Sequence, residues 1–106
     1  MEKVKMDAKH EVAIMERAIE TYGKESQILK TIEEMSELTK ALLKYSFEDT
    51  GIYWAAVREE MADVFVMLSQ MELIFGDVTD IEIEKLERLE RRLDSVVQMR
   101  DMRDQV

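Results

Sequence analysis

Apolar residues recur at intervals of three and four along most of this chain, and few of its residues interrupt a helix. The spacing is that of one face of an α-helix with about 3.6 residues per turn. The 106 residues include no proline and only three glycines, the two residue types that most strongly weaken or end helices. A sheet would need turn residues between short strands. The pattern therefore predicts an all-α protein.

The periodic stretches divide the chain into four expected helices. They span roughly residues 8–22, 25–45, 53–75 and 79–99. Gly23 suits the C-terminal cap of the first helix, and residues 47–51 are expected to form the loop between the second and third helices. Thr79 and Glu82 have the spacing of a capping box at the start of the fourth helix.

The length of the chain bounds its organisation. A chain of 106 residues suffices for one hydrophobic core and is too short for two. We therefore predict a single domain over residues 1–106, with helices arranged like a four-helix bundle. Residues 1–7 and 100–106 are expected to fray.

Composition and charge exclude several classes of protein. The chain has no cysteine, which rules out disulfides and thiolate metal sites and fits a reducing cytoplasm. The residues before the first helix lack the apolar core of a signal peptide, and the longest strictly apolar run, Val64–Leu68, is too short to cross a bilayer. A formal net charge of −9 argues against a nucleic-acid polymer as partner. We expect a cytoplasmic protein that binds neither membrane nor nucleic acid.

Two matched acidic segments are the strongest candidate for a functional site. EEMSEL begins at Glu33, and EEMADV begins at Glu59, 26 residues later. Each segment places two carboxylates three residues apart, so that on a helix their Cβ atoms are about 5–6 Å from each other. Oxygen-only ligands suit a hard cation such as Mg²⁺, for which Mn²⁺ can substitute. The predicted metal ligands are Glu34, Glu37, Glu60 and Asp63.

Helical phase places these acids beside the apolar face of their helices. At about 100° per residue, Glu34 and Glu60 occupy the same position relative to the apolar stripe, and Glu37 matches Asp63. Lys30 lies on the face of Glu34. Asp63 also interrupts an otherwise apolar stretch, where an unpaired carboxylate would be costly. The shared phase favours a metal site over two solvated helix faces, the ordinary explanation of acidic pairs in an acidic chain.

Other candidate residues are less specific. Glu33 and Glu59 lie at the edge of the predicted site, where a water-positioning role and simple exposure are both open. His10 is the only histidine, so the two Glu-x-x-His motifs of helical di-iron sites cannot form. Tyr53 is the best-placed aromatic residue for a sugar or base, because it lies about 10 Å along its helix from Glu60. No set of polar residues identifies the base.

The acidic motifs resemble those of a known enzyme family. Glu-Glu-x-x-Glu followed by Glu-x-x-Asp in a small helical chain resembles the MazG-like nucleoside triphosphate pyrophosphohydrolases, part of the all-α NTP pyrophosphatase superfamily. The resemblance covers roughly residues 27–92, including Lys30 and a weaker block that runs from Lys85 to Arg88.

The resemblance implies a reaction and roles for particular residues. Enzymes of this family use Mg²⁺ to split a nucleoside triphosphate between the α and β phosphates, which releases the monophosphate and pyrophosphate. The implied metal ligands are the four paired acids, and the expected catalytic residues are these acids together with Glu33. We expect Lys30 to bind a phosphate, Tyr53 to lie near the sugar or base, and Lys85 or Arg88 to reach in from the fourth helix.

Three other functions stay open. Related branches of the family cleave phosphoribosyl-ATP, although the Tyr-His pair often found after the aspartate there is replaced here by Val64-Phe65-Val66. A non-enzymatic helical interaction protein would use its acids only to solvate the surface. A nucleotide sensor would bind metal and nucleotide without cleavage.

The chain is expected to work as a homodimer or homotetramer. Four helices in so short a chain bury a modest share of their surface, yet each carries an apolar seam. The seam of the fourth helix is Leu86, Leu89, Leu93 and Val96, flanked by Glu and Arg residues. Such flanks suit pairing between helices. The family resemblance also implies a nucleotide pocket completed by a neighbouring subunit.

Overall fold

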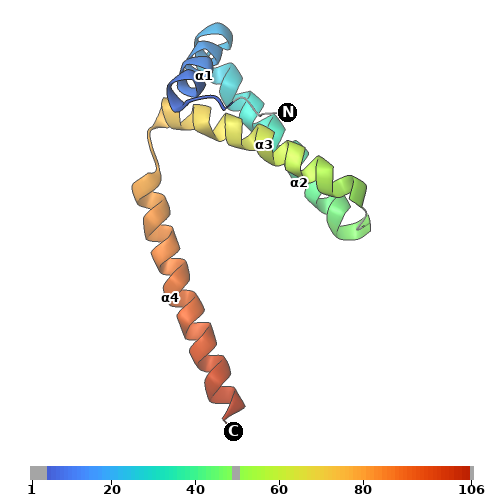
Figure 1. The fold of residues 1–106 in the computed structure, drawn as a ribbon, viewed down its shortest axis with the longest axis vertical. Helices are drawn as coiled ribbons and strands as arrows, with labels where there is room; N and C mark the ends of the chain where they lie inside the picture. The colour runs from blue at the N-terminus through green and yellow to red at the C-terminus, as the bar shows by residue number, and fades with distance from the viewer. Residues whose placement is uncertain (1–4, 49–50, 106) are drawn as a thin grey trace. The chain divides into compact units, whose positions relative to one another are not determined.

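The structure, a computed structural model, describes residues 5–48 and 51–105, and these residues are almost entirely helical (Figure 1). The helices are α1 (Ala8–Tyr22), α2 (Lys24–Glu48), α3 (Gly51–Phe75) and α4 (Thr79–Asp104). No strand occurs in the described ranges. The predicted all-α fold with four helices is confirmed. The chain divides into two compact units, Met1–Gly76 and Asp77–Val106.

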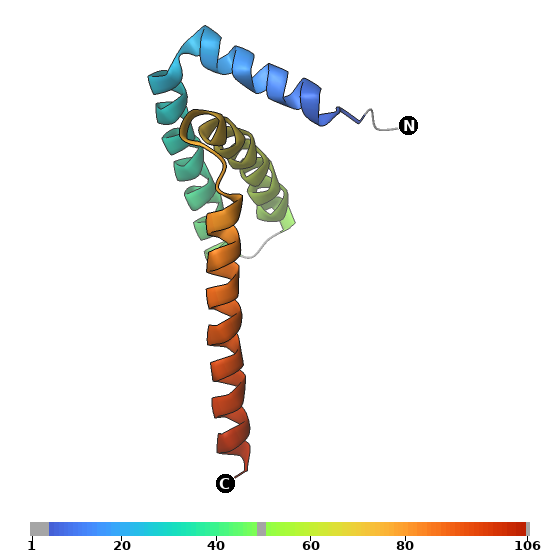
Figure 2. The ribbon, with the colours of Figure 1, turned by 90° about the vertical axis from the view of Figure 1, so that its left-hand side faces the viewer.

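In the first unit, α2 and α3 lie side by side and run in opposite directions (Figure 2). Gln27 near the start of α2 meets Gln70 near the end of α3, with 2.7 Å between the two side-chain amides. At the other end of the pair, the rings of Tyr45 and Trp54 have centroids 6.1 Å apart. Helix α1 also belongs to this unit and packs against both α2 and α3.

The apolar core of this unit is small and lies between α2 and α3. Its buried apolar side chains are Ala41, Val64 and Met67. Of these, Val64 belongs to the predicted apolar stripe of its helix, whereas Ala41 and Met67 each lie two turns after an acid, on the face of Glu34 and Glu60. The small side chain of Ala41 lets α2 and α3 approach closely. Polar side chains on the facing sides of the two helices are therefore also near one another.

Polar side chains are buried in the same interface. Gln27 and Gln70 are 7% and 4% exposed, and Gln27 Nε2 donates a hydrogen bond to Gln70 Oε1. The buried Thr31 hydroxyl donates to the backbone carbonyl of Gln27 at 2.8 Å. A buried amide without a partner is costly, so this pairing favours one alignment of α2 against α3.

The turn between α1 and α2 is a single residue, Gly23. Its φ of +93° and ψ of 149° lie in a region that residues with a side chain rarely adopt. Its N–H donates to the carbonyl of Ile19 at 2.9 Å, which satisfies a terminal carbonyl of α1. Gly23 therefore ends the first helix, as its position in the sequence predicts.

The loop expected at residues 47–51 is shorter than predicted. Phe47 and Glu48 continue α2, and Gly51 already belongs to α3. The remaining positions of that loop, 49 and 50, lie outside the described residues. Neither proline nor glycine lies between Tyr45 and Glu48, so nothing in the sequence ends the helix at Tyr45.

The predicted capping box at Thr79 and Glu82 is wrong in its details. Val78 occupies the N-cap position, and Thr79 is the first residue of α4. The carboxylate of Asp77 accepts hydrogen bonds from the Thr79 backbone N–H at 3.1 Å and from its hydroxyl at 2.7 Å. An aspartate two residues before a backbone N–H can accept a hydrogen bond from it directly. Because the Thr79 hydroxyl also donates to this carboxylate, it does not cap the helix.

Helix α4, described by itself, buries none of its residues. Its apolar seam residues Leu86, Leu89, Leu93 and Val96 are 45–55% exposed. The helix is also rich in charges of both signs. Among the described residues, no helix combines the length and apolar character needed to cross a membrane.

Candidate metal centre

Three carboxylates from α2 and α3 converge in the first unit. Glu34 comes from α2, and Glu60 and Asp63 come from adjacent turns of α3. One oxygen of each side chain lies within 4.8 Å of the others. Glu34 and Glu60 are half-buried, whereas Asp63 is exposed. The group is therefore open on one side, where a cation with its own water molecules could enter.

The alignment of the two helices explains why these acids meet. Gln27 and Gln70 are level with each other across the interface. Glu34 lies seven residues after Gln27, and Asp63 lies seven residues before Gln70. Seven residues are about two helical turns, so Glu34 and Asp63 are level again and on the same face of the pair.

Glu37, the fourth predicted ligand, lies beside the group of three. The same alignment places it level with Glu60, ten residues from the respective glutamines. Its carboxylate points to Lys40, with 3.6 Å between Oε1 and Nζ. This ion pair is between exposed side chains and adds little stability, so it would resist little if a cation drew the carboxylate towards the other acids.

The acids act electrostatically on Glu60. Loss of hydration by partial burial raises the pKa of Glu60, and the negative charges of Asp63, Glu34, Glu37 and Glu59 raise it further. The cluster therefore carries more negative charge than its surroundings offset. A divalent cation would remove this repulsion.

Lys30 is the positive group at the edge of the cluster. Its Nζ is 3.2 Å from Glu34 Oε1 and 3.5 Å from Glu33 Oε1. The hydrogen bond to Glu34 and the charges of both glutamates raise the pKa of Lys30. The Glu34 side chain is 14% exposed and that of Glu33 is 61% exposed. Lys30 therefore pairs with one half-buried and one exposed glutamate.

The remaining predicted site residues have different surroundings. Tyr53 is half-buried on α3, and Glu59 is exposed one residue before Glu60. Lys85 and Arg88 are exposed on α4, in the second compact unit. Lys30, Glu33 and Glu37 thus lie at the acidic cluster. The two basic residues of α4 belong to the second unit and are described only within it.

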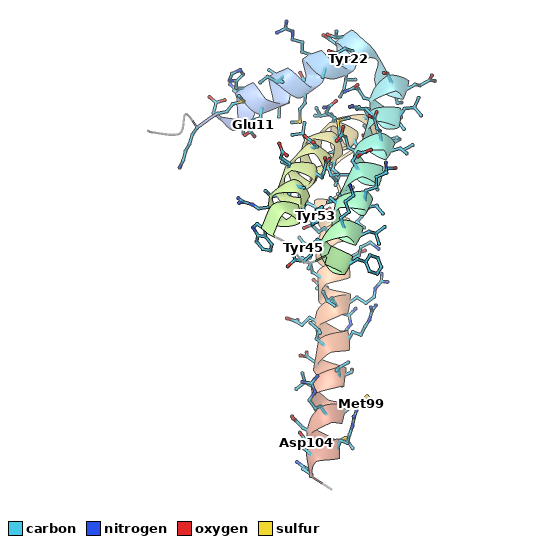
Figure 3. All side chains as sticks on the ribbon, turned by 90° about the vertical axis from the view of Figure 1, so that its right-hand side faces the viewer. Glu11, Tyr22, Tyr45, Tyr53, Met99 and Asp104 are labelled. Atoms are coloured by element: carbon cyan, nitrogen blue, oxygen red, sulfur yellow. The ribbon has the colours of Figure 1, made fainter. Side chains whose placement is uncertain are left out.

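A pocket of about 600 Å³ lies next to Lys30, on the side away from Tyr53. Its lining comes from all three helices of the first unit and includes Tyr22, Gln27, Lys30, Glu33 and Gln70. Figure 3 shows Tyr22 at the end where α1 meets α2, and Tyr45 with Tyr53 at the opposite end of the α2–α3 pair.

Sequence reasoning missed the two glutamines of this pocket. The available signal is helical phase: Gln27 precedes Glu34 by two turns, and Gln70 follows Asp63 by two turns, so each shares the face of an acid. Neutral amides do not stand out in a search for charged ligands.

Comparisons with protein-family models, curated proteins and solved structures find no match to this chain.

Proposed function

We propose that this chain is a Mg²⁺-dependent nucleoside triphosphate pyrophosphohydrolase that releases nucleoside monophosphate and pyrophosphate. The observation that carries the proposal is the convergence of Glu34, Glu60 and Asp63, with carboxylate oxygens from two helices within 4.8 Å of one another. The resemblance of the two acidic motifs to those of the MazG-like enzymes supplies the reaction and the position of cleavage.

The donor set suits the proposed ion. All three side chains offer carboxylate oxygens, which hard cations such as Mg²⁺ and Mn²⁺ prefer. Glu37 would complete the set by leaving its exposed ion pair with Lys40. When bound, the ion supplies charge screening for the phosphate oxygens and lowers the pKa of the attacking water.

Lys30 has two uses in this proposal. In the free chain, its ammonium group partly neutralises Glu34 and Glu33. When substrate binds, the same group donates a charge-assisted hydrogen bond to a phosphate oxygen. Glu33 stays within reach of Lys30 and orients it, or positions a water beside the cluster.

A pyrophosphate-release assay tests the proposal. Each ribonucleoside and deoxyribonucleoside triphosphate, and phosphoribosyl-ATP, would be incubated with the chain in Mg²⁺ and, as control, in excess EDTA. Pyrophosphate should appear only with the metal, and mass spectrometry in ¹⁸O-water should show nucleoside monophosphate as the other product.

Each alternative gives a different result in this assay. Orthophosphate as the first product would defeat the assignment of the cleaved bond. Metal-dependent nucleotide binding with no product would identify a sensor. Binding of neither metal nor nucleotide would leave a helical interaction protein, whose melting temperature Mg²⁺ should not raise.

A further inference from the structure

The pocket beside Lys30 has the size and lining of a ligand site. Its volume of about 600 Å³ falls within the range of roughly 300–1,000 Å³ common for small-molecule sites. Its walls combine apolar side chains, Leu29 and Met67, with the polar side chains of Gln27 and Gln70. Such sites typically have apolar walls and a few fixed polar groups.

The polar groups of the pocket are held in place. Gln27 Nε2 donates to Gln70 Oε1 at 2.7 Å, and Gln70 Nε2 is 3.7 Å from the sulfur of Met67. Because both glutamines are more than nine-tenths buried, their positions are set by packing before any ligand arrives. Each amide has one donor and one acceptor group, and the mutual hydrogen bond uses only part of this capacity.

An aromatic ring lies at the mouth of the same pocket. Tyr22, the last residue of α1, lines the pocket and is 67% exposed. Its position is fixed by the turn at Gly23 that directly follows it. An exposed ring at the edge of a pocket is suited to stacking on the face of a planar ligand.

Lys30 connects the pocket to the acidic cluster. It lines the pocket, and its Nζ is 3.2 Å from Glu34, one of the three converging acids. A ligand that fills the pocket and extends past Lys30 therefore reaches the carboxylates. A planar group joined to a charged chain fits this arrangement.

We propose that the pocket between α1, α2 and α3 binds the nucleoside end of the substrate, with the base against Tyr22 and its hydrogen-bonding edge on the Gln27–Gln70 pair. This inference rests on the function proposed above and adds the site of base recognition. It places the base beyond Lys30, at the end of the α2–α3 pair opposite Tyr53, which the sequence had favoured for this role.

The glutamine pair also predicts that the pocket accepts all four bases with similar affinity. If both amides rotate together, their mutual hydrogen bond is kept while the donor and acceptor offered to a ligand exchange places. The Watson–Crick edge of every base has a donor next to an acceptor, in one order or the other. The pair can therefore match each base, and we expect affinities for the four ribonucleoside monophosphates to span less than about tenfold.

Nuclear magnetic resonance of the glutamine side chains tests this directly. The chain has four glutamines and no asparagine, so its carboxamide signals are few. Ribonucleoside monophosphates, added without metal, should shift the side-chain signals of Gln27 and Gln70. Gln98 and Gln105, in the second unit, serve as internal controls and should not move.

Variants of exposed aromatic residues complete the test. Tyr22→Ala should weaken monophosphate binding by about fivefold or more, since it removes base stacking, and Tyr22→Phe should restore most of it. Phe65→Ala is the matched control, because Phe65 is also exposed but lines a different pocket. Unmoved Gln27 and Gln70 signals, or a loss of binding with Tyr53→Ala in place of Tyr22→Ala, would overturn the proposal.

Inorganic tripolyphosphate with Mg²⁺ separates this inference from the proposed function. It probes the acidic cluster without a nucleoside and should bind the unmodified chain and Tyr22→Ala equally. If tripolyphosphate does not bind but monophosphates shift the two glutamines, the metal site is wrong and the nucleoside pocket stands. If tripolyphosphate binds and monophosphates shift neither glutamine, the metal site stands and the pocket assignment fails.

Discussion

Asp63, Glu34 and Glu60 differ in exposure although they converge on one point. Asp63 is exposed, whereas the other two are half-buried. Hydration already stabilises an exposed carboxylate, so Asp63 loses more water when a metal binds. The half-buried pair is pre-organised by the packing of α2 against α3, which lowers the entropic cost of binding.

Removal of one converging carboxylate should abolish most activity. Glu34→Gln, Glu60→Gln and Asp63→Asn each keep the shape of the side chain and remove a metal ligand, so pyrophosphate release in limiting Mg²⁺ should fall by about 100-fold or more. Circular dichroism should show an unchanged helical content. Glu72→Gln, which changes an exposed acid elsewhere on α3, is the matched control. A variant of the cluster with near-normal activity would remove that residue from the site.

The pH dependence of the free energy of unfolding should reflect the titration of Glu60. Its pKa is raised in the folded chain above the ordinary value of 4.5, so between the two pKa values the folded state binds more protons than the unfolded state. The free energy of unfolding of the metal-free chain therefore falls as pH rises through this range. Glu60→Gln should be more stable than the unmodified chain above the raised pKa and equal to it below pH 4.5.

Urea denaturation in EDTA across pH measures this difference. Glu72→Gln again serves as the control for loss of one negative charge. A Glu60→Gln variant whose stability runs parallel to the unmodified chain at every pH would show that Glu60 does not carry the excess charge of the cluster.

At the scale of the helices, the contact between α2 and α3 depends on a small residue. Ala41 is buried at 7% exposure, so Ala41→Leu would force added volume between the helices. We expect a loss of about 1–3 kcal/mol in the free energy of unfolding. The same change at the exposed Ala55 of α3 should stay within about 0.5 kcal/mol. Equal effects at the two positions would contradict the assigned interface.

Helix existence could be predicted from the sequence, but several helix ends could not. Helix α2 extends to Glu48, α3 begins at Gly51, and α4 continues to Asp104 through residues that were expected to fray. Apolar spacing without proline gave all four helices, and Gly23 ends the first of them as expected. The start of α4 depends on the side chain of Asp77, which accepts from both the N–H and the hydroxyl of Thr79. Such local competition between neighbouring polar groups is invisible to a periodicity argument.

Part of the candidate site could be predicted in the same way. Helical phase placed Glu34, Glu60 and Asp63 beside the apolar stripes, and the structure brings them together. The pocket was not predictable from one helix at a time, because its lining joins α1, α2 and α3. Which face of α1 meets the other two helices is decided by tertiary packing and by the single-residue turn at Gly23.

At the scale of the whole molecule, α4 predicts self-association. Isolated helices are marginally stable in water, and most gain their stability by packing an apolar face. The described part of the second unit holds no other helix, so within that unit nothing covers the seam at Leu86, Leu89, Leu93 and Val96. The mixture of acidic and basic residues along the seam matches a second copy of the same helix better than a partner of one charge.

Light scattering coupled to size-exclusion chromatography checks this prediction. The mass should be at least twice the 12.5 kDa of one chain. Leu89→Glu, which places a charge in the seam, should shift the mass towards that of the monomer, whereas Ser95→Glu on the polar side of α4 should not. A monomeric unmodified chain with full pyrophosphate release would remove both the self-association and the idea of a shared pocket.

The buried amide pair also holds the alignment of α2 against α3 on which the spacing of the acidic cluster depends. A slip of one residue between α2 and α3 would move facing side chains by about 1.5 Å and break the bond between Gln27 and Gln70. Mg²⁺ accepts ligands at about 2.0–2.1 Å, whereas Ca²⁺ tolerates about 2.3–2.6 Å in looser geometry. Two neutral side chains, each two turns from an acid of the cluster, thus hold the spacing of the three carboxylates. We predict that a change at Gln27 or Gln70 alters the preference between Mg²⁺ and Ca²⁺ by shifting those carboxylates.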